Sequence, residues 1–430
     1  MKHDNRLFGA ARVAIATAAA ALALGIGLAS PTAVPSAEAD GVLPVFDFAG
    51  EITTPATMIY NPTGEFIFPS ILHASEYFDA PLGEWYLYYA PHENPGGISL
   101  MYADSLDGPW TEYAANPLIA NQWAPHYSVN HVSSPDAIWN HEADKLFLYF
   151  HGGNDQTRFA SSADGITFSY EQTAVDNADG GTGITETSYA RVFPHPDATS
   201  MYNYGMFYMD NTSANQRRIR VAESVDGREW VVRPDPIVTS GSLEGGNVSG
   251  ANLWEWQGQL YVIYHGSTGK IFARTIDETL STTGPTVLLH KASGIGEDTG
   301  RTASPEIVSF GGTTYLFYEA GARLDATVAY AVAPFELNVA STAQSACVDG
   351  VASITVDAVN QSGVRVDIRL TTSYGDKKYV GIASGASAHW TFSTGVASIP
   401  SGEALVAAFV RIDGVAHYEQ VPTGYGAITC

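Results

Sequence analysis

Five aromatic, apolar runs recur along the chain between about Phe68 and Leu337. None of them alternates between apolar and polar positions, so each predicts a strand that is buried on both faces. Each run follows a short motif with its own apolar stretch and precedes a further strand. The five runs are Trp85–Tyr89, Leu146–Phe150, Tyr204–Tyr208, Leu260–Tyr264 and Tyr315–Tyr318.

The motif that opens each repeat ends on a polar residue, and these residues are 66, 55, 61 and 54 positions apart. A period of that length, with several short strands per copy, is typical of a β-propeller. The sequence therefore predicts an all-β fold with a five-bladed β-propeller, in which the starts of the inner strands converge on one central hole. The residues expected to line the hole are Ser70, Asp136, Arg191, Asn252 and Glu306.

A second set of polar residues lies just beyond the aromatic runs. Because the second strand of each blade returns toward the face where the first began, we expect these residues to form an outer ring on that face. They are His92, His151, Asp210, His265 and Glu319. A third repeated feature, the Asp-Gly step at Asp107, Asp164 and Asp226, predicts tight hairpin turns.

The ends of the chain differ from the repeats. Residues 1–39 combine early basic residues, an apolar stretch and a small-residue cleavage site, which predicts a secretory signal peptide, or less readily a retained anchor. The propeller is expected over 40–338, with the segment before Glu65 supplying a strand that closes the ring. A linker is expected at 339–346. Alternating apolar positions over 347–430 predict a small antiparallel β-sandwich.

The chain has two cysteines, Cys347 and Cys430, at the two ends of the predicted sandwich. An even pair in a secreted chain predicts a disulfide. This domain is expected to be an accessory domain. The alternative is a sugar-stacking platform built from its exposed aromatic residues, such as Trp390.

The net charge of the chain is −24. That charge argues against nucleic acid and anionic membrane surfaces as partners, because both require basic patches. It also disfavours highly anionic glycans unless local arginines, lysines or a cation intervene. Beyond the N-terminal segment no run is long and apolar enough to span a bilayer.

The predicted inner ring offers the chemistry of glycoside hydrolysis, which needs two carboxyl groups beside one bond. Asp136 and Glu306 are the first candidates, with Glu186 as a competitor. Arg191 would bind the sugar or lower the pKa of a neighbouring carboxylate, and Asn252 and Tyr189 would bind the sugar. The alternative is structural: a carboxylate at the start of a strand caps backbone groups or pairs with Arg191.

Histidines at equivalent blade positions, His151 and His265, are expected to bind sugar hydroxyls, act as acids or make structural hydrogen bonds; His131 is a weaker candidate. Several histidines near one axis could also hold a metal, although no metal-ligand spacing is present. The chemistry requires no cofactor, and a structural cation in the central channel is an open alternative.

The steps Ser134-Pro135-Asp136 and Asp107-Gly108-Pro109-Trp110, with five blades, resemble those of the five-bladed glycoside hydrolases of family 43 and its relatives. The resemblance covers about residues 45–338. It implies that Asp136 matches the blade-two Asp that tunes the acid, and that Glu186 loosely matches the blade-three acid. The blade-one step is Phe68-Pro69-Ser70, so the base expected there is absent.

These features predict a secreted glycoside hydrolase that acts on a polysaccharide or its oligosaccharides. Two alternatives stay open: a carbohydrate-binding propeller without catalysis, and a polysaccharide lyase that uses Tyr189 and a histidine for proton transfer. A hydrolase yields a new reducing end, a lyase an unsaturated product that absorbs in the ultraviolet, and a binding module neither.

Overall fold

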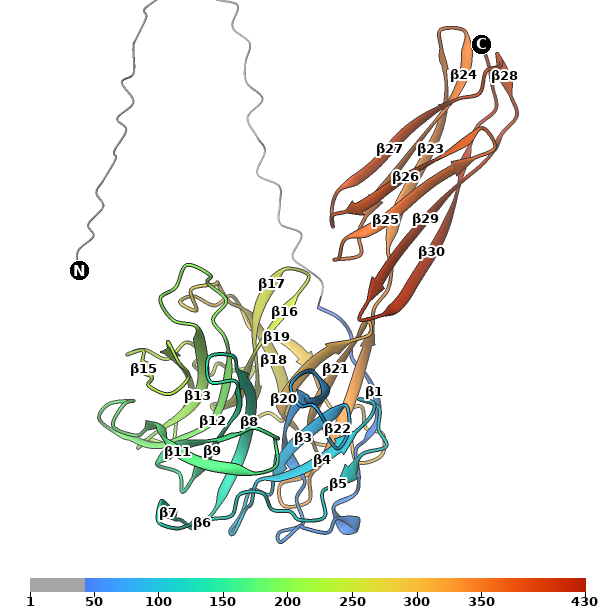
Figure 1. Ribbon diagram of the computed structural model, residues 1–430. Coiled ribbons are helices and arrows are strands. Elements are labelled where there is room, and N and C mark those ends of the chain that lie inside the picture. The colour runs from blue at the N-terminus through green and yellow to red at the C-terminus, as the bar shows by residue number, and fades with distance from the viewer. Residues whose placement is uncertain (1–42) are drawn as a thin grey trace, which may run out of the picture. The chain divides into compact units, whose positions relative to one another are not determined.

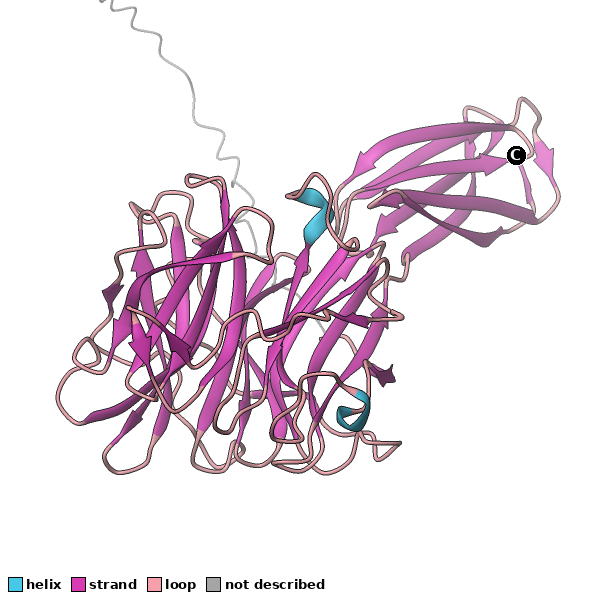
Figure 2. Cartoon of the chain, turned by 60° about the horizontal axis from the view of Figure 1, so that its bottom comes forward, coloured by secondary structure: helices cyan, strands magenta, loops and turns pink. Residues whose placement is uncertain are grey.

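The computed structural model describes residues 43–430, and these residues form β-strands with two short 3-10 helices, η1 (Pro55–Thr57) and η2 (Ala74–Glu76) (Figures 1 and 2). The all-β prediction is confirmed. The predicted signal peptide lies outside the described residues. Within residues 43–430, no helix has the length and apolar character needed to cross a membrane.

Five four-stranded antiparallel sheets are built from the five sequence repeats. Each inner strand carries the repeat motif, and each second strand carries the aromatic run. The first sheet contains β2 (Ile67–His73), β3 (Trp85–Ala90), β4 (Ser99–Ala103) and β5 (Thr111–Glu112). The second contains β8 (Val132–Asn140), β9 (Lys145–Gly152), β10 (Gln156–Ser162) and β11 (Phe168–Asp176). The third contains β12 (Ile184–Pro194), β13 (Tyr204–Thr212), β14 (Arg217–Ser224) and β15 (Val231–Val232). The fourth contains β16 (Val248–Trp256), β17 (Gln259–Gly266), β18 (Lys270–Thr275) and β19 (Val287–His290). The fifth contains β20 (Thr302–Phe310), β21 (Thr313–Ala320), β22 (Thr327–Pro334) and β1 (Asp47–Glu51).

The five inner strands close into a propeller-like ring. Strand β2 contacts β8, β8 contacts β12, β12 contacts β16, β16 contacts β20, and β20 returns to β2. The ring is closed in sequence as well, because β1 from the start of the fold pairs with β22 from its end. This confirms that the entry segment supplies the closing strand. A separate two-stranded sheet, β6 (Gln122–Trp123) and β7 (Tyr127–Ser128), lies between the first and second repeats in sequence.

The aromatic second strands form the core between neighbouring sheets. All six residues of β3 are buried, and in β9 every residue after Lys145 is buried. Their hydroxyls also join one sheet to the next: Tyr88 donates to the Gly165 carbonyl at 2.8 Å, and Tyr149 donates to the Gly227 carbonyl at 2.5 Å. Both acceptors belong to the Asp-Gly turns, so these turns are structural, as predicted.

Every inner strand contains the same β-bulge. The register against the second strand shifts at the repeat motif in all five sheets. The first residue of each motif has a positive φ, between 45° and 59°, a conformation that is costly for residues other than glycine. These residues are Phe68, Ser134, Tyr189, Gly250 and Ser304. The motifs therefore lie inside the inner strands, whereas the sequence placed them at the strand starts.

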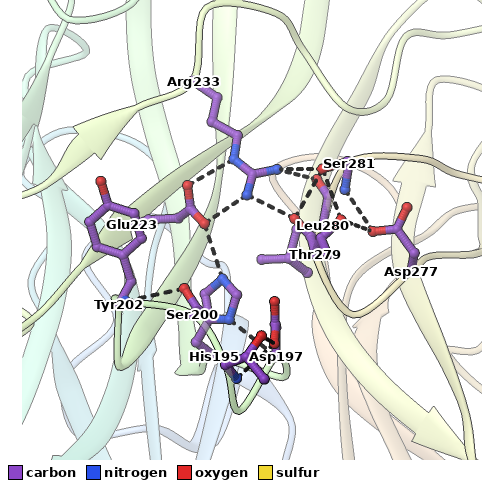
Figure 3. A network of polar contacts seen from close by, with 11 residues as sticks. His195, Asp197, Ser200, Tyr202, Glu223, Arg233, Asp277, Thr279, Leu280 and Ser281 are labelled. Carbon is purple, nitrogen blue, oxygen red and sulfur yellow. Dashed lines mark hydrogen bonds and ion pairs between the residues drawn. The ribbon is translucent and has the colours of Figure 1, made fainter.

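A polar network joins the third and fourth sheets (Figure 3). The Arg233 guanidinium donates to both carboxylate oxygens of Glu223, at 2.7 and 2.8 Å, and to the carbonyls of Thr279 and Leu280. His195 contacts the same carboxylate at 3.0 Å. Burial raises the pKa of Glu223, but the hydrogen bonds from Arg233 and His195 outweigh it and lower the pKa. The network therefore has a structural role.

The C-terminal residues form two main sheets that share one core. Residues 339–346, which the sequence predicts as a linker, form most of β23 instead. Small and polar side chains there alternate between a half-covered face and an exposed face, and all ten residues of β23 pair with β24. The sheets contain β23 (Val339–Val348), β24 (Val351–Asn360) and β27 (Ser387–Ser393); β26 (Gly375–Ile382), β25 (Val366–Thr372), β29 (Gly402–Ile412) and β30 (Val415–Tyr425); and the short pair β28 (Ser398–Ile399) and β31 (Ile428–Thr429).

The two cysteines are bonded. Cys347 at the end of β23 and Cys430 form a disulfide with a Cα–Cα distance of 5.6 Å, as the sequence predicts. The bridge links the first strand of the C-terminal sheets to the last residue of the chain.

Candidate functional site

Residues from all five sheets meet at the ring axis. The Arg191 guanidinium lies 3.2 Å from Asp136 and 3.6 Å from Glu306, and it donates to the Pro69 carbonyl at 2.8 Å. Asn252 donates to Glu306 at 2.6 Å. We call Asp136, Arg191, Asn252 and Glu306 the axial cluster. The repeat register therefore predicted correctly that these four residues converge.

The axial cluster is buried, whereas the sequence predicts that its residues line a central hole. Asp136, Arg191 and Glu306 are 5%, 3% and 8% exposed. Every carboxylate oxygen has a protein partner, including the Val192 N–H at 2.7 Å for Asp136 and the Ile71 N–H at 3.5 Å for Glu306. Ser70 is also buried, and its hydroxyl accepts the Ala137 N–H at 3.0 Å. These side chains bind one another and hold the sheets together.

The electrostatics of the cluster follow from two carboxylates that share one arginine. Burial raises the pKa of Glu306 to about 7; Arg191 opposes the increase and the nearby Asp136 adds to it. Burial also raises the pKa of Asp136, against the charge of Arg191 and the Val192 hydrogen bond. The pair therefore favours holding a proton at mildly acidic pH.

An open pocket of about 380 Å³ lies at the end of the inner strands where the outer ring was predicted. We call it the axial pocket. Of the predicted residues it is lined by Tyr189, His92 and His265, and the axial cluster is not part of its lining. The remaining lining residues are Glu65, Ile67, Arg217, Asn247, Ser249, Gly266, Ser267, Arg301 and Arg323.

Tyr189 comes from a bulge, and its ring lies among other rings of the site. It is 5.3 Å from Phe68, 5.9 Å from His151 and 6.4 Å from His265, measured between ring centroids. Burial raises the pKa of Tyr189 to about 12; Arg217 and Arg301 act to lower it, and Glu319 and Glu186 act to raise it. Its hydroxyl is therefore protonated at neutral pH and within electrostatic reach of two carboxylates and two guanidinium groups.

Each of those carboxylates is paired with an arginine of the pocket lining. Glu186 lies 3.5 Å from Arg217 and accepts the Ser188 hydroxyl at 3.0 Å. Glu319 is paired with Arg301 and accepts the Ser304 hydroxyl at 2.5 Å. Both carboxylates are buried, at 7% and 1% exposure, and adjoin the pocket through their arginines.

Three buried histidines, His131, His151 and His265, are neutral at physiological pH. Burial lowers the pKa of His265 and of His151 well below the usual value, and burial also lowers that of His131. His131 and His151 share a contact of 3.3 Å between their Nε2 atoms, and the Nδ1 of His265 accepts the Ser304 N–H at 3.1 Å. Over residues 43–430, no group of three or more His, Cys, Asp and Glu side chains is arranged to hold a metal ion.

One predicted outer-ring residue has a structural role. Asp210 is fully buried and ion-paired with Arg218, at 2.6 Å, and with Arg220. The three arginines of the pocket lining, in contrast, were not predicted from the sequence. A signal was present for Arg217, because the run Arg217-Arg218-Ile219-Arg220 concentrates cations in a chain with only 21 Lys and Arg residues.

Comparisons with known proteins place the fold. No known family model matches the chain, and no curated protein is significantly similar in sequence. Among solved structures, a complex of BT0996 with RGII is similar, with a TM-score of 0.52 and 14% identity over 67% of this chain and 92% of that one. An N-acetylgalactosamine deacetylase from F. plautii has a TM-score of 0.49 and 13% identity, over 67% and 96% of the two chains. The α-L-arabinofuranosidase PaAbf62A from Podospora anserina has a TM-score of 0.46 and 11% identity, over 67% and 96%.

Glycoside hydrolases of families 43 and 62 are among the similar structures. The similarity to the BT0996 complex, at a TM-score of 0.52, supports the fold. At these identities the comparisons establish the fold alone, so the chemistry must be argued from this chain's own pocket.

Proposed function

We propose that this chain is a secreted glycoside hydrolase, in which a five-bladed β-propeller carries the reaction and a C-terminal β-sandwich is an accessory domain. The axial pocket carries the proposal. Two carboxylates from different sheets, Glu186 and Glu319, adjoin it through Arg217 and Arg301, which line the pocket together with Tyr189. Glycoside hydrolysis needs such a pair, one to protonate the leaving oxygen and one to activate water or attack the sugar.

In this proposal Glu186 and Glu319 carry the acid and base roles. Tyr189 and His265 bind sugar hydroxyls, since a protonated phenol and a neutral imidazole both offer hydrogen bonds at neutral pH. Asp136 and Glu306, the pair favoured by the sequence, hold the five sheets together, because their shared arginine, Arg191, lies outside the pocket lining. The arginines paired with Glu186 and Glu319 are part of that lining.

The test is a screen of the purified protein against a panel of polysaccharides and oligosaccharides, read by new reducing ends. On the substrate found, Glu186→Gln and Glu319→Gln should each lower kcat by roughly 10²–10⁴-fold. Glu171→Gln is the matched control. Glu171 also pairs with an arginine, Arg228, at 2.6 Å, but this pair is not part of the pocket. The same loss in folded Asp136→Asn and Glu306→Gln, with both pocket variants active, would move the chemistry to the axial cluster.

A lyase is the second candidate, and one observation favours it: Tyr189 and His265 share the pocket with Arg217 and Arg301. A lyase needs proton-transfer groups and a cation beside a sugar carboxylate. Ultraviolet absorbance measured on the same panel separates the two reactions. A protein that binds a glycan without either product is a carbohydrate-binding module.

A further inference from the structure

The lining of the axial pocket is cationic in a strongly acidic chain. Three of its twelve residues are arginines, in a protein with 21 Lys and Arg against 45 Asp and Glu. Its one acidic lining residue, Glu65, is 1% exposed, and its two oxygens accept the N–H groups of Leu324, at 2.9 Å, and His92, at 3.2 Å. The polar groups of the lining that are available to a ligand are therefore mainly hydrogen-bond donors.

The three arginines are held by carboxylates that are not part of the lining. Glu186 lies against Arg217, Glu319 against Arg301, and Glu93 against Arg323 at 2.7 Å. A guanidinium has five N–H donors in a planar fork, and each of these pairs uses only part of it. The pairs orient the arginines and leave donors for a ligand.

The charges around the pocket limit the negative charge of a ligand, because the three guanidinium groups are outnumbered by four carboxylates. The lining carries three guanidinium groups and one carboxylate, and three further carboxylates lie behind it. A doubly charged group would be repelled by those carboxylates, whereas a monovalent, planar group fits the fork of one or two guanidiniums. The volume of about 380 Å³ is near the lower end of the range, roughly 300–1,000 Å³, that is usual for small-ligand pockets.

We propose that the axial pocket binds a sugar residue that carries a carboxylate, a uronic acid, with the carboxylate held by Arg217 and Arg301. This inference rests on the proposed function and names its substrate class. Tyr189, Asn247 and His265 bind the hydroxyl groups of the same sugar. The overall charge of −24 does not oppose it, because the ligand contacts the local arginines at short range, where screening by salt is weakest.

The test is calorimetric binding of acidic oligosaccharides, each paired with its own carboxyl-reduced form. Oligomers of galacturonate, glucuronate and mannuronate serve as probes, and the reduced forms differ only in the carboxylate. We expect at least one acidic probe to bind ten-fold or more tightly than its reduced form. Equal binding of every pair, or no binding of any acidic probe at millimolar concentration, would overturn the proposal.

Variants assign the effect to the arginines. Arg217→Gln should weaken binding of the acidic probe by ten-fold or more and change binding of the reduced form by less than two-fold. Arg323→Gln is the second variant. Arg323 lines the pocket but is not assigned to the carboxylate, so this variant should weaken binding of the acidic probe to a smaller extent. Arg228→Gln is the control, since Arg228 has a similar exposure, 34% against 32% for Arg217, and lies outside the pocket.

The remaining outcomes are also decisive. A sulfated monosaccharide that binds as tightly as the uronate would overturn the carboxylate assignment. Cleavage of neutral glycans alone would overturn the inference while supporting the proposed function. Arginine-dependent binding of uronates without cleavage of any glycan would support the inference and reject the hydrolase.

Discussion

At the scale of single residues, the axial cluster shows how burial changes what a carboxylate does. Asp136 and Glu306 have the residue types and the register of a catalytic pair. They lie within 3.6 Å of one guanidinium and away from the pocket lining. Two buried carboxylates beside one arginine leave an excess negative charge, which a proton on Glu306 removes. The stability of the fold should therefore depend on pH through this residue.

Glu306→Gln should flatten that dependence. The pKa of Glu306 is about 7 in the folded protein, against an ordinary value of 4.5. Between pH 4.5 and pH 7, Glu306 is therefore protonated in the folded protein and ionised in the unfolded chain. Wild-type stability from this group is thus full below about pH 4.5 and is lost as pH rises toward 7. At about 1.4 kcal/mol per pKa unit, the largest change in unfolding free energy from this group is roughly 3 kcal/mol.

The measurement is urea unfolding from pH 4.5 to 8 of the wild type and the variant. The difference in unfolding free energy should shift in favour of Glu306→Gln as pH rises, and contributions from the histidines cancel in that difference. Glu403→Gln, at an exposed position, is the control. A difference that does not change with pH would mean that Glu306 is charged throughout.

At the scale of elements, the bulge in each inner strand decides where the side chains go. The positive φ at the first residue of each motif brings Tyr189 to the axial pocket, and the third residue of the same motif, Arg191, lies in the axial cluster. In the fourth sheet, the first residue of the motif is Gly250. A Cβ there would lie 3.0 Å from His265 Nδ1 and 3.3 Å from the Ser304 Cα.

Gly250→Ala should therefore destabilise the protein by more than its backbone conformation alone explains. The φ of +58° costs roughly 1–2 kcal/mol for alanine, and the displaced His265 ring would lose the Ser304 N–H. Gly258→Ala is the matched control, because Gly258 has a φ of +80° and no atom within 4 Å of the added Cβ. We expect at least about 1 kcal/mol of additional loss at Gly250 in urea unfolding. Equal losses would show that the ring moves freely.

At the scale of the whole molecule, the ring and the C-terminal sheets are secured separately. The ring is closed by β1 in the fifth sheet and by the axial cluster, whereas the C-terminal sheets have their own core and the Cys347–Cys430 bridge. The bridge spans 83 residues, all of which belong to those sheets and their loops. Its stabilisation should therefore be confined to the C-terminal part.

Replacing both cysteines, Cys347→Ser with Cys430→Ser, should lower the stability of the C-terminal sheets by about 4 kcal/mol at most, as expected for a loop of this length. Calorimetry of the full chain should show one transition moving to lower temperature and the transition of the ring unchanged. Chemical reduction of the wild type should reproduce the shift. A shift of both transitions together would show that the ring also depends on the bridge.

The sequence by itself determined the architecture of this protein and the convergence of its axial residues. The five-fold register of apolar strands is a local pattern, and a closed ring of sheets is the arrangement that buries strands with two apolar faces. The same pattern identified Tyr189, His92 and His265 as residues of one face, and cysteine number and position identified the disulfide. The prediction of a linker at 339–346 was wrong, because small polar residues also suit a strand with one exposed face.

Only the tertiary structure decided which polar residues are open to a ligand. Asp136 and Glu306 look like a catalytic pair in sequence, but their burial depends on the bulges and on Arg191, which comes from a third sheet. Arg301 and Arg323 lie outside every repeat motif, and they reach the pocket because the ring brings the loops of separate sheets together. The exposure of a side chain and the partner of a charged group both depend on residues that are distant in sequence, so no local pattern could reveal them.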